Sequence, residues 1–141
     1  MAKPLLYFLC TGNSCRSQMA EGFALQMAGG RFEIASAGIE PSSLNPRAIA
    51  AMREAGVDIS THTSKAIDLA LLRRADVVVT LCGDANDRCP SVPEARLRLH
   101  WDLQDPARAQ GTEAERMAVF RAVRDDIRRR VADLVAQPPA G

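Results

Sequence analysis

Lysine is scarce in this sequence, and neither sign of charge is in excess. Lys3 and Lys65 are the only lysines, and 18 Lys and Arg residues stand against 17 Asp and Glu, for a net charge of +1. This balance excludes the electrostatic footprint of a protein that binds nucleic acid or an anionic membrane. The densest basic run, residues 128–130, lies in a predicted helix beside several aspartates, which is typical of a solvated helix face.

Long apolar runs are also missing. No stretch approaches the length of a membrane span, and the apolar run before Cys10 is too short for the core of a secretory leader. We therefore expect a cytoplasmic protein. Cysteine is limited to 4 residues, and thiols in a reducing compartment are more often catalytic or metal-binding than paired in structural disulfides.

Repeats, internal linkers and low-complexity segments are absent, so we expect one domain over residues 1–141, working as a monomer. Its pattern alternates strands and helices, which favours an α/β fold: an open four-stranded parallel sheet with helices on both faces. The predicted strands are residues 4–10, 32–37, 75–81 and 96–101, the last at a sheet edge. The predicted helices are residues 15–28, 46–55 and 64–72, and a final helix that begins with a Thr112/Glu115 capping box and buries Phe120, Val123, Ile127, Val131 and Leu134.

The most informative segment directly follows the first predicted strand. Residues 10–17 read Cys-Thr-Gly-Asn-Ser-Cys-Arg-Ser and combine a thiol, a glycine-bearing turn, an arginine and a helix start that Ser14 is expected to cap. Inward-facing N–H groups and the planar fork of Arg16 form an oxyanion cradle. The same field stabilises a thiolate, so we expect Cys10 to be nucleophilic at neutral pH.

Topology predicts a partner for Cys10. Right-handed crossovers make the first and third strands neighbours, and both then end at the same rim of the sheet, at Cys10 and Cys82. Adjacent strands lie about 4.8 Å apart, and a disulfide needs Cα atoms about 5.5–6 Å apart. A bond between Cys10 and Cys82 is therefore geometrically feasible.

Cys89 follows Cys82 by two helical turns, about 10 Å if the segment is helical, so a bond between these two thiols requires the segment to remodel. Its Gly, Asp and Asn content suits such a change. The alternatives are that Cys82 fills the core and Cys89 has no role, or that the thiols bind zinc, for which their spacing is wrong. Cys15 is expected to pack, with a backup redox role as the alternative.

Asp105 follows the fourth strand in an Asp-Pro turn. An acid at that rim is placed to protonate a leaving oxygen, although Asp-Pro is also common in ordinary turns.

Together these residues resemble the thioredoxin-coupled arsenate reductases built on the low-molecular-weight tyrosine phosphatase fold. The resemblance rests on CTGNSCRSQMAEG at 10–22, SAGI at 36–39, NP at 45–46, HTS at 62–64, VVTLC at 78–82, CP at 89–90, HW at 100–101 and DPA at 105–107. It covers nearly the whole chain, and the cradle, the redox pair and the acid turn coincide in it.

The resemblance implies reduction of arsenate to arsenite by three cysteines, as part of arsenic resistance. Cys10 would attack arsenate held by Arg16 and by the loop residues Thr11, Gly12, Asn13, Ser14, Cys15 and Ser17, with Ser17 hydrogen-bonded to the nucleophile and Asp105 assisting departure of hydroxide. Cys82 would then attack Cys10, and Cys89 would attack Cys82. Thioredoxin would reduce the final disulfide, and phosphate and sulfate would act as substrate analogues. No tightly bound cofactor is implied.

One position departs from the pattern. The family holds a potassium ion near Asn13, Glu21, Ser36, Thr63 and an aspartate at the position of Lys65. Either the Lys65 ammonium takes the place of the cation or the site is absent, and we favour the former.

Two other functions compete. A tyrosine phosphatase on the same fold needs the cradle and the acid but neither Cys82 nor Cys89, and it typically carries an aromatic residue where this chain has Ala107. A non-enzymatic redox sensor would use the cysteine pair as a switch.

Overall fold

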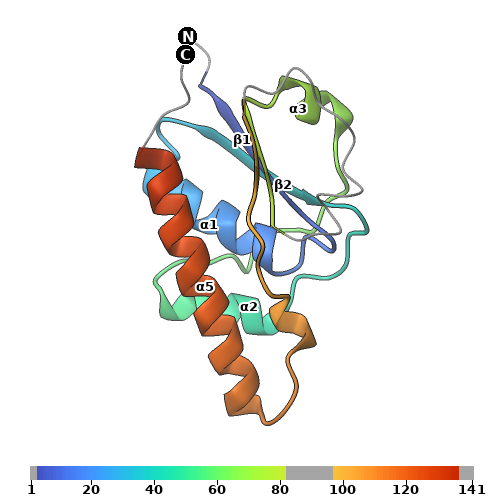
Figure 1. The fold of residues 1–141 in the computed structure, drawn as a ribbon, viewed down its shortest axis with the longest axis vertical. Helices are drawn as coiled ribbons and strands as arrows, with labels where there is room; N and C mark the ends of the chain where they lie inside the picture. The colour runs from blue at the N-terminus through green and yellow to red at the C-terminus, as the bar shows by residue number, and fades with distance from the viewer. Residues whose placement is uncertain (1–2, 82–96, 137–141) are drawn as a thin grey trace.

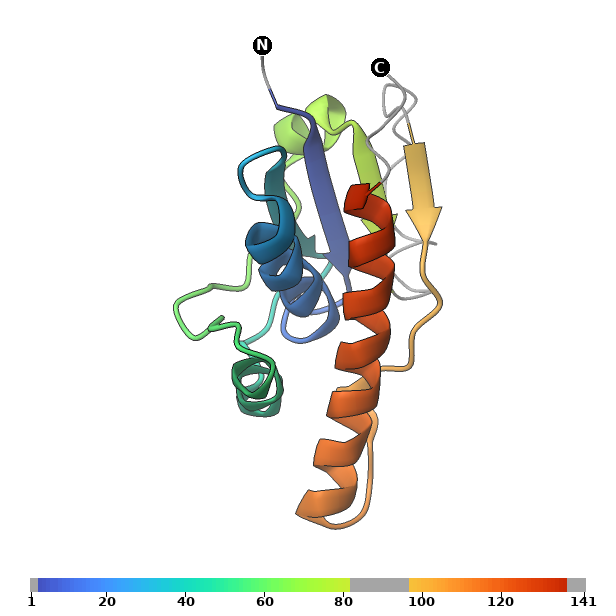
Figure 2. The same cartoon turned by 90° about the vertical axis from the view of Figure 1, so that its left-hand side faces the viewer.

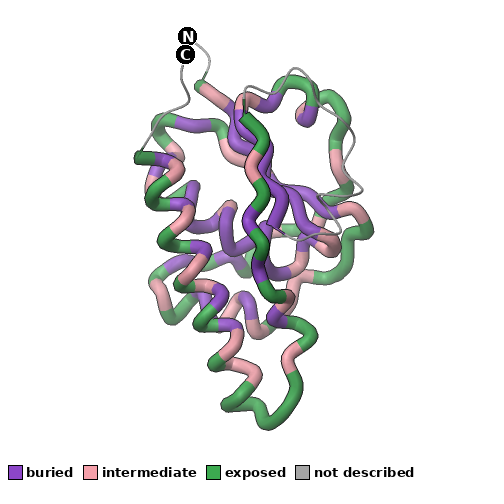
Figure 3. Tube along the Cα trace, viewed as in Figure 1, coloured by how far each residue is buried: buried purple, intermediate pink, exposed green. Residues whose placement is uncertain are grey.

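Four short parallel strands form the centre of the molecule. The structure, a computed structural model, describes residues 3–81 and 97–136. The strands are β1 (Leu5–Cys10), β2 (Glu33–Gly38), β3 (Val77–Thr80) and β4 (Leu97–His100), and their order in the sheet is β2-β1-β3-β4. β1 and β3 are direct neighbours, as predicted, and β4 is an edge strand. Every residue of β1 and β3 is buried, whereas β4 is largely exposed (Figure 3).

Helices cover both faces of this sheet. α1 (Arg16–Ala28) and α5 (Glu113–Ala136) pack against each other on one side, with α2 (Pro46–Glu54) below them, and α3 (Leu69–Arg74) lies on the other side (Figures 1 and 2). A short 3-10 helix, η1 (Pro106–Arg108), links β4 to α5. The predicted α/β fold is confirmed. Within the described residues, no helix is long and apolar enough to cross a membrane.

Local signals explain several helix ends. Asn45 caps α2 by accepting a hydrogen bond from the Arg47 N–H, with Pro46 at the first helical position. The capping box before α5 is confirmed, because Thr112 Oγ1 accepts from the Glu115 N–H while the Glu115 carboxylate accepts from the Thr112 N–H. α5 buries Phe120, Val123, Ile127, Val131 and Val135; the predicted Leu134 is only partly buried.

The helix predicted over residues 64–72 is wrong in its first half. Residues 64–66 are extended against the end of β2, where the Lys65 carbonyl accepts from the Gly38 N–H. α3 begins only after Asp68, whose carboxylate caps it. The apolar pattern alone does not reveal this tertiary pairing, which removes the segment from the helix.

Candidate active site

β1 ends at Cys10, and the chain then turns through residues 11–15 into α1. This anion loop (residues 10–17) holds the Cys10 Sγ atom in a polar setting, although the residue is buried. Ser17 Oγ lies 2.8 Å from Cys10 Sγ, and the Asn13 N–H donates to the same sulfur at 3.3 Å. Asn13 Nδ2 also donates to Ser17 Oγ, which leaves the Ser17 hydroxyl proton available for Cys10. Both contacts place donors beside the Cys10 sulfur.

Asn13 determines the shape of the loop. It is fully buried and is the only described residue other than glycine with a positive φ, at 50°. Its Oδ1 accepts from the Lys65 N–H at 2.9 Å and from Gln18 Nε2 at 3.0 Å, and its Nδ2 donates to Ser36 Oγ at 2.9 Å. The backbone N–H of Lys65 is an unambiguous donor, so it fixes the orientation of the Asn13 amide. These bonds hold the left-handed turn that aims the Asn13 N–H at Cys10.

Arg16, the first residue of α1, reaches across the loop toward the segment after β4. Its Nη1 donates to the Leu103 carbonyl at 3.1 Å, and its Nη2 lies 3.6 Å from the Asp105 carboxylate. Within the described residues, Arg16 Nε is the only buried side-chain nitrogen or oxygen without a hydrogen-bond partner. An unsatisfied donor on a buried cation is costly, and an oxyanion beside it would remove that cost.

Asp105 sits at the start of η1. Its Oδ1 accepts from the Ala107 N–H at 3.0 Å, and its Oδ2 lies 3.7 Å from Arg108 Nε as well as near Arg16. The turn that the sequence predicted therefore also brings the carboxyl group to the anion loop.

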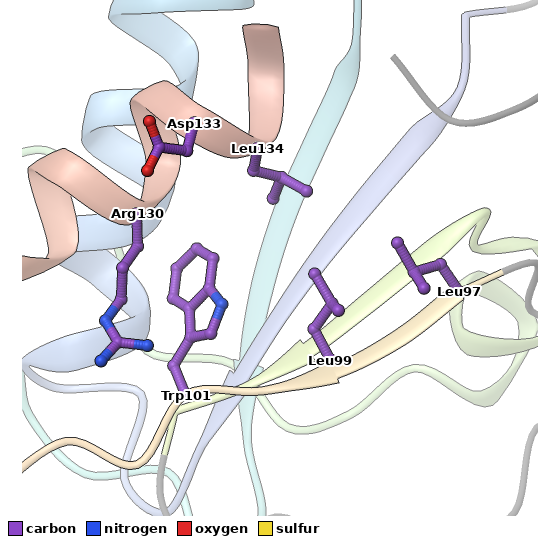
Figure 4. A pocket seen from close by; sticks show the side chains of 6 residues that line it. All are labelled: Leu97, Leu99, Trp101, Arg130, Asp133 and Leu134. Carbon is purple, nitrogen blue, oxygen red and sulfur yellow. The ribbon is translucent and has the colours of Figure 1, made fainter. Parts of the chain in front are cut away.

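A cavity of about 240 Å³ joins these groups. Among the described residues, ten line it: Cys10, Thr11, Gly12, Ser14, Cys15, Arg16, Glu40, Ser42, Asp105 and Ala107. A second hollow, between β4 and α5, is walled by Leu97, Leu99, Trp101 and Leu134 with Arg130 and Asp133 at its side (Figure 4). None of the described residues that line this hollow is a cysteine or another strong nucleophile, so the cavity above Cys10 is the candidate active site.

Cys15 differs from Cys10. Burial raises the pKa of the Cys15 thiol to about 12, so it remains protonated at neutral pH. The cap expected from Ser14 is wrong: α1 begins at Arg16 with Cys15 at the cap position and no side-chain cap, and Ser14 Oγ instead lies 3.7 Å from Cys15 Sγ. The N–H groups at the start of α1 are therefore not capped by a side chain and point to the place where an anion is expected.

The two remaining thiols, Cys82 and Cys89, lie outside the described residues. Leu81, the residue before Cys82, donates its N–H to the Leu9 carbonyl at 2.9 Å. The register of the two strands pairs Leu9 with Thr80, so the chain leaves β3 beside the end of β1 two residues before Cys82.

The oxygens expected around a potassium ion are already bonded within the protein. Thr63 O accepts from Lys65 Nζ at 2.7 Å and from Gln18 Nε2 at 2.9 Å, and Asn13 Oδ1 has the two donors named above. Ser36 Oγ donates to the Glu21 carboxylate. Among the described residues, no group of three or more His, Cys, Asp and Glu side chains is placed to hold a metal. This oxygen set does not fit a bound potassium ion without losing protein hydrogen bonds.

Sequence reasoning missed Gln18, Glu40 and Ser42. Gln18 is fully buried and bonds Asn13, Thr63 and His62. From the sequence alone, a glutamine in the first turn of a helix is expected on the surface. Gln18 is buried because residues 62–65 pack over α1. Glu40 and Ser42 follow β2, whose end meets the loop through the pairing of Gly38 with Cys10.

Comparison with known proteins places this site in a family. Residues 5–138 match the low molecular weight phosphotyrosine protein phosphatase family. The chain belongs to this family. The predicted resemblance to its arsenate reductases is confirmed as well: an arsenate reductase of Bacillus subtilis (strain 168) is 56% identical over 133 residues, 94% of this chain and 96% of that protein.

Solved structures agree with this placement. An arsenate reductase in its phosphate-binding state is 38% identical, with a TM-score of 0.79 over 94% of this chain and 97% of the other. A thioredoxin-dependent arsenate reductase of Corynebacterium glutamicum is 28% identical, with a TM-score of 0.77 over 96% of this chain and 61% of the other.

Proposed function

We propose that this protein is an arsenate reductase in which Cys10 is the nucleophile. The observation that carries the proposal is the buried Arg16, whose Nε has no partner, in a cavity shared with Cys10 and Asp105. A buried cation, loop N–H groups and a sulfur with two hydrogen-bond donors together suit a tetrahedral oxyanion attacked by a thiolate. The arsenate reductases among its relatives support arsenate as that oxyanion.

The first step forms a bond between Cys10 Sγ and arsenic. The Cys10 thiolate displaces one arsenate oxygen, which leaves as water after taking protons, with Asp105 placed to supply one. Arg16 neutralises charge on the remaining oxygens. Arsenic is still pentavalent in this covalent adduct, so no electrons have yet been transferred.

Reduction follows when Cys82 attacks Cys10 Sγ. The sulfur–sulfur bond forms as the sulfur–arsenic bond breaks, and its electron pair leaves with arsenic as arsenite. Cys89 then attacks Cys82 and releases the Cys10 thiolate, and a thioredoxin dithiol reduces the Cys82–Cys89 disulfide. The hydrogen bond from the Leu81 N–H to the Leu9 carbonyl keeps the chain after β3 beside the end of β1, which supports the first exchange. The thioredoxin-dependent relative supports the reductant. Reduced thioredoxin is needed throughout, so we place this activity in the cytoplasm.

Turnover with purified components tests the proposal. Protein, arsenate, thioredoxin, thioredoxin reductase and NADPH should release one arsenite for each NADPH oxidised, and Cys10→Ser should abolish both signals. Arsenite release that continues in the Cys10→Ser variant would overturn the assignment.

Phosphatase activity is the second candidate, because Cys10, Arg16 and Asp105 are also the groups that phosphoryl transfer needs. Ala107 lines the cavity where an aryl ring would lie, and a methyl group offers little surface to such a ring. We expect weak hydrolysis of p-nitrophenyl phosphate. Cys89→Ser should leave this hydrolysis intact and stop arsenate turnover, which separates the two activities.

We also propose that Lys65 supplies the charge that a potassium ion would supply. Its Nζ bonds the Thr63 carbonyl, and its N–H bonds Asn13. Arsenate reduction and the thermal unfolding midpoint should then be the same in potassium and in sodium chloride. A strong rise of either with potassium would show that the ammonium does not replace the ion.

A further inference from the structure

Gln18 is a fully buried polar side chain in the first turn of α1, and it does not line the cavity above Cys10. Its Nε2 donates to two oxygens of Asn13, the main-chain carbonyl at 3.2 Å and Oδ1 at 3.0 Å. The same nitrogen donates to the Thr63 carbonyl at 2.9 Å, and its Oε1 lies 3.0 Å from His62 Nδ1. Both ends of the buried amide are therefore bonded within the protein.

The partners of this amide fix its orientation. The main-chain carbonyls of Asn13 and Thr63 can only accept hydrogen bonds, so the group that faces them is the NH2 group of Gln18. Oε1 then faces His62, whose Nδ1 has to carry a proton in order to donate to it. An amide rotated by half a turn would place its oxygen against two carbonyl oxygens.

Both donors beside the Cys10 sulfur depend on Asn13. The Asn13 N–H donates to Cys10 Sγ at 3.3 Å, and Asn13 Nδ2 donates at 2.7 Å to Ser17 Oγ, which lies 2.8 Å from the same sulfur. Asn13 has a left-handed backbone, which is an uncommon conformation outside glycine. Gln18 bonds the carbonyl and the side chain of Asn13 at once, so it restrains both the peptide and the side-chain amide.

We propose that Gln18 is a positioning residue for the reaction of Cys10: by holding both oxygens of Asn13, it aims the Asn13 N–H and, through Asn13 Nδ2, the Ser17 hydroxyl at the sulfur. The inference rests on the proposed function, in which Cys10 is the nucleophile. Arg16 has other supports, the Leu103 carbonyl and Asp105, so the anion site does not depend on Gln18. Loss of the Gln18 amide should therefore reduce the reactivity of Cys10 and not the affinity for the oxyanion.

Alkylation and anion binding, both measured on the reduced protein at pH 7, test this inference. The variant is Gln18→Met, which keeps the length of the side chain and removes its hydrogen bonds. Iodoacetamide should label Cys10 at least about fivefold more slowly in the variant, because the donors at the sulfur are no longer held in place. The calorimetric affinity for inorganic phosphate should change by less than about twofold, and labelling of Cys15 should stay slow.

Gln26→Met is the matched control, because it makes the same change at an exposed position of the same helix. It should leave both measurements unchanged. If Gln18→Met lowers only the unfolding midpoint, or speeds the labelling of Cys10 and Cys15 together, Gln18 merely fills the core and the inference is overturned. A loss of phosphate affinity as large as the loss of Cys10 labelling would overturn it as well.

Amide exchange followed by NMR gives a second readout that general destabilisation would not produce. In Gln18→Met, the Asn13 N–H should exchange with heavy water at least about tenfold faster, while the N–H of Phe8 in the buried strand β1 exchanges as before. Equal acceleration at both positions would overturn the inference. If Gln18→Met does not fold, Gln18→Glu serves in its place, since it keeps an oxygen for His62 and removes the donors to Asn13; Cys10 labelling at the parent rate would then overturn the inference.

The two proposals fail in different ways. If the protein releases no arsenite but Gln18→Met still slows the labelling of Cys10, the reductase assignment fails and the positioning role stands. If arsenite is released but the labelling rate does not move, the reductase stands and the role of Gln18 is overturned.

Discussion

Two buried thiols in one short loop have different neighbours. Cys10 Sγ receives the Asn13 N–H and lies beside the Ser17 hydroxyl. Burial raises the pKa of the Cys15 thiol to about 12, and Ser14 provides only a distant contact. The proposal that Cys10 and not Cys15 is the nucleophile rests on this difference in the placement of donors.

Alkylation should reveal this difference. At pH 7, iodoacetamide followed by peptide mapping should label Cys10 far faster than Cys15, because only a thiolate reacts. Phosphate should protect Cys10 by filling the cavity. Cys15→Ala serves as the matched variant and should keep arsenate turnover within about twofold, since it removes a protonated thiol. Equal labelling of the two residues would contradict the account.

Ser17 is expected to contribute to catalysis through its hydrogen bond with Cys10. Ser17→Ala removes a hydroxyl 2.8 Å from the sulfur, and a hydrogen bond to a charged group contributes about 1.5–3 kcal/mol. We expect kcat/KM for arsenate to fall by at least about tenfold, with the unfolding midpoint measured alongside. A variant that keeps full activity would mean that this contact does not hold the reactive thiolate.

At the scale of elements, the end of β2 supports the anion loop from behind. A Cβ atom at Gly38 would lie 2.8 Å from both the Asn13 nitrogen and the Thr11 carbonyl oxygen. Both atoms are backbone atoms, so the loop itself would have to move. A close approach between strand and loop therefore requires glycine at this position.

Gly38→Ala should accordingly weaken both stability and anion binding. We expect a loss of about 1–3 kcal/mol in unfolding free energy, as for other overpacked sites, together with weaker phosphate affinity. Gly30→Ala is the control, because a Cβ there meets nothing within 4 Å. Equal behaviour of the two variants would show that the β2 end does not shape the loop.

α2 and α5 are joined by an ion-pair cluster centred on Glu54. Its carboxylate binds Arg121 at 2.8 Å and Arg124 at 3.1 Å. These hydrogen bonds, that from Arg121 first, lower the pKa of Glu54 to about 2 from an ordinary value of 4.5. A depressed carboxyl pKa stabilises the fold above the unfolded-state pKa, and this stabilisation is lost as the pH falls through the folded-state value.

Glu54→Gln should therefore lower the unfolding midpoint at pH 7 by a small amount, since the cluster is exposed. The gap between the variant and the parent protein should shrink as the pH falls from about 4.5 toward 2. Thermal unfolding followed by circular dichroism across that range measures it. A gap that stays constant with pH would show that the charge of Glu54 is not what stabilises the contact.

At the scale of the whole molecule, the sheet order makes the chemistry possible. β1 and β3 are adjacent and parallel, so their carboxyl ends share one edge, and the segment after β4 delivers Asp105 to the same place. The adjacency of β1 and β3 could be predicted from strand alternation and crossover handedness, whereas for Asp105 the sequence left an ordinary turn as the alternative. The predicted Ser14 cap and the first half of the helix over 64–72 were wrong, because Ser14 Oγ lies against Cys15 Sγ and residues 65 and 66 pair with the end of β2.

The residues whose roles could not be predicted from the sequence have one feature in common. Gln18 is a polar helix residue, yet it is buried under residues 62–65. Glu40 lies in a loop, and it comes close to the anion loop only because the segment after β2 bonds to residues 10–12. Their roles arise from tertiary placement, which local periodicity does not encode. A motif with its own chemical pattern, such as the anion loop, can be recognised in the sequence without knowledge of the tertiary structure.

The most direct test of the account is a disulfide map of the Cys89→Ser variant after one exposure to arsenate without thioredoxin. Alkylation of free thiols followed by mass spectrometry should find a single Cys10–Cys82 bond and one equivalent of arsenite per protein, whereas the parent protein should show Cys82–Cys89. Arsenite released without that bond, or a Cys10–Cys15 bond in its place, would contradict the proposed path of electrons from sulfur to arsenic.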